Sequence, residues 1–161
     1  MGRLHDFFHR IRVRLGLVGD RTRIKRAGSD VPLVAVVLQR ADHWCATHAG
    51  IAHRSGGNLR VVHLGSHEWL LDDAANDAKW LYAVPNVADE DGEYLAGFCR
   101  RIVKANASHK IPYAFEFEAD TRFDPGTGKY IGPPGVGGLT CSTFVAAVFR
   151  SAGVPLVLLD T

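Results

Sequence analysis

The feature that most constrains this chain is a cysteine that stands between a glycine-rich turn and an amphipathic helix. Residues 138–149 read Gly-Leu-Thr-Cys-Ser-Thr-Phe-Val-Ala-Ala-Val-Phe, so apolar residues recur at helical spacing after Cys141. Gly153 and Pro155 mark where this helix ends. The start of a helix carries partial positive charge and unpaired amide donors, and both stabilise a thiolate. The sequence therefore predicts a nucleophilic Cys141 in the first turn of a helix.

A histidine that could act as the base stands far upstream. His48 heads an alternating apolar segment, residues 47–54, and precedes Cys141 by 93 positions. A thiol nucleophile needs such a base within hydrogen-bond reach, and the base needs a third group that fixes its ring. A cysteine at a helix start together with a histidine on a distant strand indicates a thiol hydrolase, and only the fold can join the two residues.

A glycine-rich hairpin places a second histidine beside the first. The alternating segments on either side of Gly56–Gly57 are a strong hairpin signal, which would set residue 48 opposite residue 64 or 65. His63 would then lie close to His48 on the neighbouring strand and could bond its second ring nitrogen. His67 and Glu68 are alternative third members of the site.

The rest of the chain predicts an α+β class with a mostly antiparallel sheet. Strands are expected at residues 31–38, 47–54, 58–64, 67–71 and 79–84, with Asp72 and Asp73 in an acidic loop between the last two. Residues 89–106 have one buried stripe at helical spacing. Residues 112–118 alternate and are expected to be extended. Residues 120–138 are rich in Gly and Pro and are expected to form a long loop, a kind of segment that is often functional.

The first 26 residues differ from the rest in charge. They hold eight Lys and Arg residues against two acidic residues, and their apolar residues recur at helical spacing. We expect a basic amphipathic helix over residues 1–26 and a single domain over residues 27–161. Such a helix usually packs on its own domain, and the alternative is peripheral contact with an anionic membrane or a protein partner.

Composition excludes several classes of protein. The chain has 161 residues, 47% of them hydrophobic and 22% charged, with a net charge of +2, which suits one globular domain. No basic groove with interleaved aromatic residues indicates nucleic-acid binding. No apolar run reaches the roughly 18–20 residues that span a bilayer, and arginines interrupt the one stretch that a secretory signal could use. We expect a cytoplasmic protein, or one exported without a cleavable signal peptide, that needs no cofactor.

The remaining cysteines and histidines are expected to have other positions. Three scattered cysteines without a Cys-x-x-Cys spacing indicate free thiols and neither a disulfide framework nor zinc. Cys99 stands beside Phe98 in the predicted helix and is expected to pack in the core, whereas no role is assigned to Cys45. The histidines expected at the surface or in loops are His43, His53 and His109.

Three motifs and their order resemble the circularly permuted branch of the NlpC/P60 papain-like superfamily, with its YiiX-like and lecithin retinol acyltransferase-like members. His48-Ala-Gly-Ile resembles the family's His-Val-Gly-Ile strand, and Val61-Val-His63 resembles its second-strand histidine. Thr140-Cys141-Ser142-Thr-Phe144-Val resembles its Asp-Cys-Ser-Gly-Phe-Val nucleophile helix. The cysteine comes first in the unpermuted enzymes and last here. The resemblance covers roughly residues 31–155 and favours His63 as the third member of the site.

The resemblance implies a permuted papain-like fold, with an antiparallel sheet packed against the helix that bears the nucleophile. It implies a cysteine hydrolase, peptidase or acyltransferase that attacks an amide or ester bond through a Cys141–His48–His63 triad and an acyl-thioester. The oxyanion would be bound by the Cys141 backbone amide and a tyrosine hydroxyl. Tyr113 and Tyr130 are the candidates, and Tyr113 better matches the permuted relatives. The implied substrates are a peptide, a peptidoglycan peptide or a lipid.

Two departures from the family pattern weaken the peptidoglycan interpretation. Thr140 stands where murein-directed members often have Asp, and Gly132-Pro133-Pro134 replaces an aromatic-Gly-Gly run. One alternative is a binding module that keeps the fold and uses its cleft for recognition. Another is a metal site in which His48 and His63 converge with Asp42 or Glu68, although that site would leave Cys141 without a role.

Overall fold

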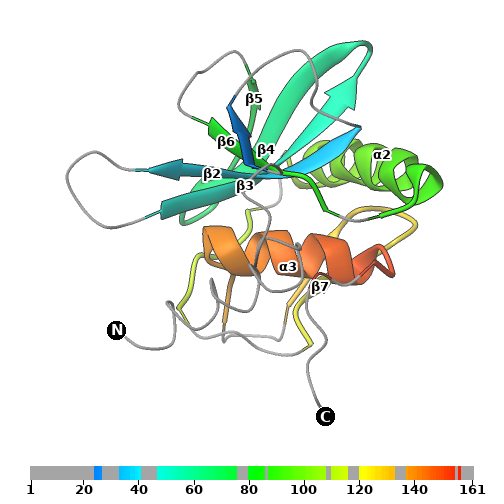
Figure 1. Cartoon of the computed structure of the whole chain (residues 1–161). Coiled ribbons are helices and arrows are strands. Elements are labelled where there is room, and N and C mark those ends of the chain that lie inside the picture. The colour runs from blue at the N-terminus through cyan, green and yellow to red at the C-terminus, as the bar shows by residue number, and fades with distance from the viewer. Residues whose placement is uncertain are drawn as a thin grey trace.

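A six-stranded antiparallel sheet forms the centre of this α+β structure (Figure 1), which is a computed structural model. The described residues are 24–26, 33–40, 47–75, 80–85, 87–107, 110–115, 120–132, 137–154 and 156. The strands are β1 (Ile24–Arg26), β2 (Val34–Arg40), β3 (Thr47–Ser55), β4 (Asn58–Ser66), β5 (Trp69–Ala74) and β6 (Trp80–Ala83). Their spatial order is β1-β6-β2-β3-β4-β5, and every neighbouring pair is antiparallel.

The hairpin between β3 and β4 sets the register of the centre of the sheet. Gly56 and Gly57 have φ values of 57° and 85°, in the left-handed region that favours glycine, and they form a two-residue turn. Ile51 lies opposite Val62, and the same register continued to residue 48 sets it opposite residue 65. The predicted hairpin and its register are confirmed. His48 and His63 therefore project from the same face of the sheet.

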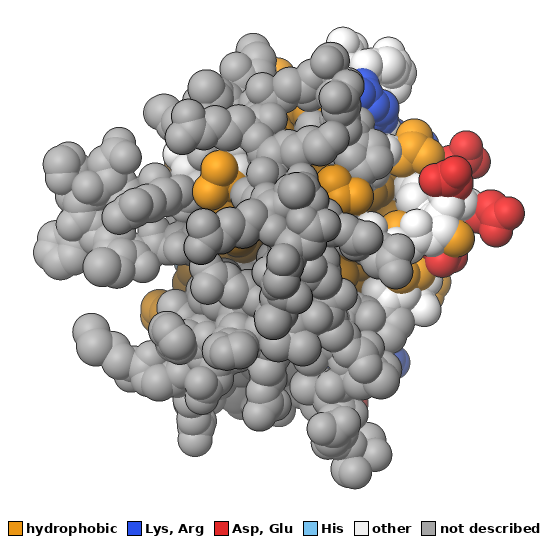
Figure 2. Space-filling view, in the orientation of Figure 1, with side chains coloured by type: hydrophobic (Ala, Val, Ile, Leu, Met, Phe, Trp, Pro, Cys, Tyr) orange, Lys and Arg blue, Asp and Glu red, His pale blue; other side chains and the backbone are white. Residues whose placement is uncertain are grey.

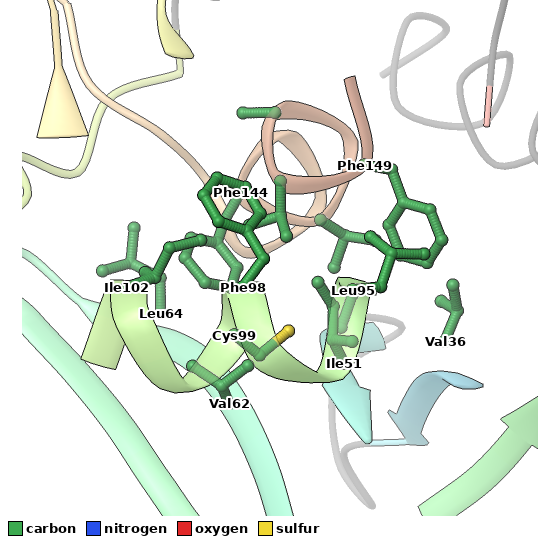
Figure 3. Close-up of a cluster of buried hydrophobic side chains, with 14 of the residues drawn as sticks. Val36, Ile51, Val62, Leu64, Leu95, Phe98, Cys99, Ile102, Phe144 and Phe149 are labelled. Carbon is green, nitrogen blue, oxygen red and sulfur yellow. The ribbon is translucent and has the colours of Figure 1, made fainter. Parts of the chain in front are cut away.

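Two helices, α2 (Asp89–Asn106) and α3 (Cys141–Ser151), pack on one face of the sheet. The predicted bounds of α2 and the predicted start of α3 are confirmed. Figure 3 shows the core between them, where aromatic side chains of both helices meet aliphatic side chains of the strands. The labelled residues of this core are Val36, Ile51, Val62, Leu64, Leu95, Phe98, Cys99, Ile102, Phe144 and Phe149. The expectation that Cys99 packs in the core is confirmed.

The opposite face of the sheet carries a second buried cluster, made of Ala35, Val37, Ala52, Val61, Trp80 and Tyr82. The register assigns His48 and His63 to this second face, because Ala52 and Val61 on the same two strands belong to it.

Acidic side chains gather at one side of the molecule, where α2 lies (Figure 2). The first turn of α2 supplies Asp89, Glu90 and Asp91. Carboxylates at this end complement the positive end of the helix dipole. This arrangement stabilises the start of α2 although no side chain caps it.

The acidic loop expected at Asp72 and Asp73 is wrong, because both residues belong to β5. Acidic residues are uncommon in strands. Here each carboxylate has a cross-strand partner on β4, since Asp72 accepts from Arg60 at 2.8 Å and Asp73 contacts His63 at 3.1 Å. These pairs stabilise a strand that intrinsic propensity disfavours.

The surface or loop position expected for His53 is wrong, because this residue is fully buried in a strand. It lies on β3 with its Nε2 3.4 Å from Asp72 Oδ1. Burial lowers the pKa of His53 below its ordinary value, although the Asp72 carboxylate opposes this change. His53 alternates with the residues of the His48 face, so it lies on the face that the helices cover.

The segment 120–138 contains more structure than the long loop that its composition predicts. β7 (Arg122–Phe123) and β8 (Tyr130–Ile131) form a two-stranded sheet of their own. Phe123 is fully buried and its ring meets Phe144 of α3 edge-on. The Asn106 carboxamide of α2 accepts from the Tyr130 amide at 3.0 Å. These contacts fasten the hairpin to both helices.

The N-terminal prediction is largely outside the described residues, which begin at Ile24. Ile24–Arg26 form β1 and pair with β6, so a helix that reaches residue 26 is wrong at its last three residues. Cys45, His43 and His109 also lie outside the described residues. None of the helices in the described part of the chain is long and apolar enough to cross a membrane.

Removal of the Phe98 ring tests the core. The ring is fully buried between α2, α3 and the sheet. We expect Phe98→Ala to lower the free energy of unfolding by about 3–5 kcal/mol, measured by urea denaturation. Phe115→Ala is the matched control, because the Phe115 side chain is 87% exposed and its removal should change little. Equal losses in the two variants would contradict this packing.

Candidate active site

The start of α3 holds Cys141 as the first residue of the helix, and Thr140 is its N-cap. The Thr143 amide donates to Thr140 Oγ1 at 3.1 Å, and the Thr140 amide donates to Thr143 Oγ1 at 2.7 Å. This reciprocal pair is a capping box with threonine in both positions. No acidic residue lies in the first turn, so no carboxylate there neutralises the positive end of the helix dipole next to Cys141.

The surroundings of Cys141 favour its thiolate. Burial alone raises the pKa of Cys141, whose side chain is 8% exposed. Hydrogen bonds from the His48 side chain and the Ala49 backbone N–H, the charge of His48, and the Ser142 hydroxyl lower it further than burial raises it. The pKa of Cys141 therefore lies below its ordinary value. A buried thiol with a lowered pKa is the property expected of a nucleophile.

Cys99 is the internal comparison. It is fully buried in α2, and Figure 3 shows its sulfur among apolar side chains. Burial raises the pKa of Cys99 to about 12, and the negative charge of Asp72 adds to this effect. Of the two cysteines in the described part of the chain, only Cys141 has surroundings that stabilise a thiolate.

The two predicted histidines are in contact. His48 Nε2 lies 2.7 Å from His63 Nδ1, and the two rings meet edge-on with centroids 4.7 Å apart. The Trp80 ring of β6 packs against both imidazoles, with centroids 6.0 Å from His48 and 5.6 Å from His63. One nitrogen of His48 is thus held by His63 while its side chain bonds Cys141. The structure brings Cys141, His48 and His63 together.

Gly50 makes this histidine contact sterically possible. A Cβ atom at residue 50 would lie 2.9 Å from His63 Cβ and 3.0 Å from the Val62 carbonyl oxygen. The register sets residue 50 directly opposite His63. Glycine in the His-Ala-Gly-Ile motif therefore leaves room for the imidazole of the neighbouring strand.

His63 has a further partner that the sequence did not identify. Its Nε2 lies 3.1 Å from Asp73 Oδ2 of β5. Burial lowers the pKa of His63, the hydrogen bond to Asp73 opposes this change, and the charge of His48 lowers the pKa again. Cys141, His48, His63 and Asp73 form a continuous chain of contacts. The observation that identifies Asp73 is its position on β5. Leu71 lies opposite His63, and Asp73, two residues further along the strand, projects from the same face.

Tyr113 is the tyrosine that reaches Cys141. Burial raises the pKa of its hydroxyl, and the charge of Cys141 raises it further. The hydroxyl also interacts with the backbone N–H and the side chain of Cys141. The Cys141 amide and the Tyr113 hydroxyl, two of the candidate oxyanion donors named from the sequence, therefore adjoin one another.

The segment that carries Tyr113 is held on both sides. On one side, the Tyr113 amide donates to His67 Nδ1 at 3.2 Å and the Glu68 amide donates to the Ile111 carbonyl at 3.0 Å. On the other side, the Leu139 amide donates to the Pro112 carbonyl at 2.9 Å. His67 therefore contacts the Tyr113 segment.

Glu68 and Tyr130 also have other partners. Glu68 forms an ion pair of 2.7 Å with Lys110. Tyr130 packs its ring on Phe123 with centroids 5.9 Å apart, and burial raises the pKa of its hydroxyl. Of the two tyrosines named from the sequence, Tyr113 is the one that interacts with Cys141.

The metal-site alternative lacks a converging set of ligands in the described residues. No group of three or more His, Cys, Asp or Glu side chains there is arranged to hold a metal ion. Glu68 pairs with Lys110, and Asp42 lies outside the described residues. His48 uses its Nε2 to contact His63.

Comparison of the chain with protein-family models, with curated proteins and with solved structures found no match. Evidence for what the protein does therefore comes from the geometry of Cys141, His48 and His63 and from the chemistry that this geometry permits.

Gly50→Ala tests the steric argument. The added methyl group would collide with His63 and push its ring away from His48, so we expect a loss of about 1–3 kcal/mol in the free energy of unfolding. We also expect slower alkylation of Cys141 by iodoacetamide at pH 7. Gly97→Ala in α2 is the control, because the nearest atom to an added Cβ is 3.6 Å away on a flexible arginine. Wild-type stability and reactivity in Gly50→Ala would refute the argument.

Proposed function

We propose that the protein is a cysteine hydrolase or acyltransferase that attacks an amide or ester carbonyl through Cys141. One observation carries the proposal: a buried cysteine at a helix start has a lowered pKa and bonds a histidine, which a second histidine holds in place. A structural cysteine needs none of these features, as Cys99 illustrates.

The first half of the reaction transfers an acyl group to sulfur. His48 takes the proton of Cys141, and the thiolate attacks the carbonyl carbon to form a carbon–sulfur bond. The carbonyl electron pair moves to oxygen, where the Cys141 amide and the Tyr113 hydroxyl donate hydrogen bonds to it. The oxyanion then collapses and the bond to the leaving group breaks. His48 returns the proton to the departing amine or alcohol, which leaves an acyl-thioester.

The second half of the reaction releases the acyl group. His48 takes a proton from water in a hydrolase, or from an acceptor hydroxyl or amine in an acyltransferase. The activated oxygen or nitrogen attacks the thioester, and the Cys141 thiolate leaves. The same two donors stabilise the second oxyanion. His63 keeps the His48 ring in place through both halves.

A circularly permuted papain-like fold of the NlpC/P60 type is the structural part of the proposal. Support comes from the order of the elements, with His48 on β3, His63 on β4 and Cys141 on the last described helix. Thr140 occupies the place where murein-directed members often have Asp, and it caps the helix through its hydroxyl. A neutral cap avoids a negative charge next to the thiolate, so the departure is compatible with nucleophilic chemistry.

The substrate part of the proposal is a peptide, a peptidoglycan peptide or a lipid. These share a carbonyl carbon bonded to an amide nitrogen or an ester oxygen, which is the bond that an activated thiolate attacks. Contact of residues 1–26 with a membrane or a protein stays a prediction from the sequence, because the structure does not describe the side chains of this segment.

Acylation of the protein by a p-nitrophenyl ester tests the proposal. We expect rapid release of p-nitrophenol and an acyl adduct that peptide mass spectrometry locates on Cys141. The adduct should be absent in Cys141→Ala and slow to form in His48→Ala, by on the order of 100-fold or more. Cys99→Ala is the control and should acylate like the wild type. Murein stem peptides and phospholipid vesicles then distinguish the substrate classes.

An unacylated Cys141 would contradict the proposal and favour the binding module. In that case Cys141→Ala would bind the same peptides or lipids as the wild type in calorimetry, with no product formed.

A further inference from the structure

We propose that Asp73 is a positioning residue that fixes the tautomers of both histidines, so that His48 presents its Nδ1 to Cys141 as the base. The sequence pattern predicts a loop at Asp73 and assigns this residue no role. The inference rests on the proposed function above, because it concerns the same site.

Asp73 determines which nitrogen of His63 carries the hydrogen. A carboxylate has no proton to donate, so Asp73 Oδ2 can only accept from His63 Nε2, which lies 3.1 Å away. His63 Nε2 therefore carries the hydrogen. His63 is buried, and burial favours its neutral form, which has a single N–H. His63 Nδ1 is then a lone-pair acceptor.

His63 in turn determines which nitrogen of His48 carries the hydrogen. His48 Nε2 lies 2.7 Å from His63 Nδ1, and since that nitrogen accepts, His48 Nε2 must donate. A neutral His48 then has its lone pair on Nδ1, the nitrogen that His63 does not use. This nitrogen can take the proton of Cys141. When it does, His48 becomes an imidazolium and keeps the same bond to His63.

The opposite pair of tautomers would disable the site. If His63 carried its hydrogen on Nδ1, it would donate to His48 Nε2 and leave a hydrogen on His48 Nδ1. A neutral His48 would then point an N–H at Cys141 and could not accept its proton. Asp73 excludes this arrangement, because it would set the His63 Nε2 lone pair against a carboxylate oxygen.

The sheet places these groups in a diagonal row across β3, β4 and β5. Asp73 lies opposite Val61, and His63 lies opposite Leu71, so both project from the same face. The other groups that act on His63 are Asp72 of β5, whose charge has the smallest effect, and the uncharged Trp80 ring of β6. Asp73 is 57% exposed, so water screens its charge and its main effect is on proton placement.

The experiment combines histidine ¹⁵N spectroscopy with the pH profile of Cys141 alkylation. Ring nitrogen shifts of the wild type should report hydrogens on Nε2 of both His63 and His48. In Asp73→Asn the amide can donate as well as accept, so we expect both tautomers of His63. We also expect the apparent pKa of Cys141 to rise by roughly half a unit, which slows alkylation about threefold below that pKa.

The matched control is Asp72→Asn, which removes the same charge from the neighbouring residue of β5. Its carboxylate faces the opposite side of the sheet, where it pairs with Arg60, so the tautomers and the Cys141 profile should stay as in the wild type. Asp73→Glu should restore the wild-type tautomers. Circular dichroism checks that each variant is folded. The tautomers of the wild type are measured on the unaltered protein, so this part of the test does not depend on whether a variant folds.

The outcomes separate this inference from the proposed function. A wild-type Cys141 that titrates as an ordinary thiol overturns both. An acidic Cys141 with unchanged tautomers and pH profile in Asp73→Asn overturns the role of Asp73 and leaves the hydrolase in place. Equal shifts in Asp72→Asn and Asp73→Asn would reduce the effect to general charge and overturn the positioning role.

Discussion

The contact between His48 and His63 is the interaction on which the candidate site depends, and the register of one hairpin sets it. The Gly56–Gly57 turn fixes that register, and Gly50 leaves room for the His63 ring. A slip of one residue in this pairing would turn His63 to the other face of the sheet. His48 would then lose the group that orients its ring. Backbone geometry at three glycines therefore positions the histidine pair that adjoins a cysteine on a distant helix.

Burial raises the pKa of both described cysteines, but the other groups around Cys141 reverse this effect. For Cys99 it raises the pKa to about 12, against about 8.5 for a free thiol, which corresponds to roughly 4–5 kcal/mol against the thiolate. Cys141 meets the same kind of cost, and the His48 side chain, the Ala49 amide and the helix start outweigh it. Thr140 completes that helix start without adding charge. The opposite pKa shifts of the two thiols thus come from the surroundings that the fold gives each of them.

Local patterns predicted the parts of the site that depend on short-range order. The helix start at Cys141 and the hairpin that joins His48 to His63 follow from spacing and turn residues. Asp73 could not be predicted in the same way, because its register depends on an irregularity between Leu64 and Ser66. The burial of His53 depends on a helix packed over its strand. The position of Tyr113 next to Cys141 depends on contacts that residues 111–113 make with residues 67–68 and with Leu139. These segments are far apart in the sequence.

The proposed chemistry requires that Cys141 be a thiolate held by His48. This requirement can be tested by the rate of iodoacetamide alkylation of Cys141 as a function of pH, followed by mass spectrometry in the wild type and in His48→Ala. Only the thiolate reacts, so a lowered pKa keeps the rate high until the pH falls through that pKa. We expect fast alkylation well below pH 8.5 in the wild type, and a profile near the ordinary thiol value of about 8.5 in His48→Ala. Coincident profiles in the two proteins would show that His48 does not stabilise the thiolate.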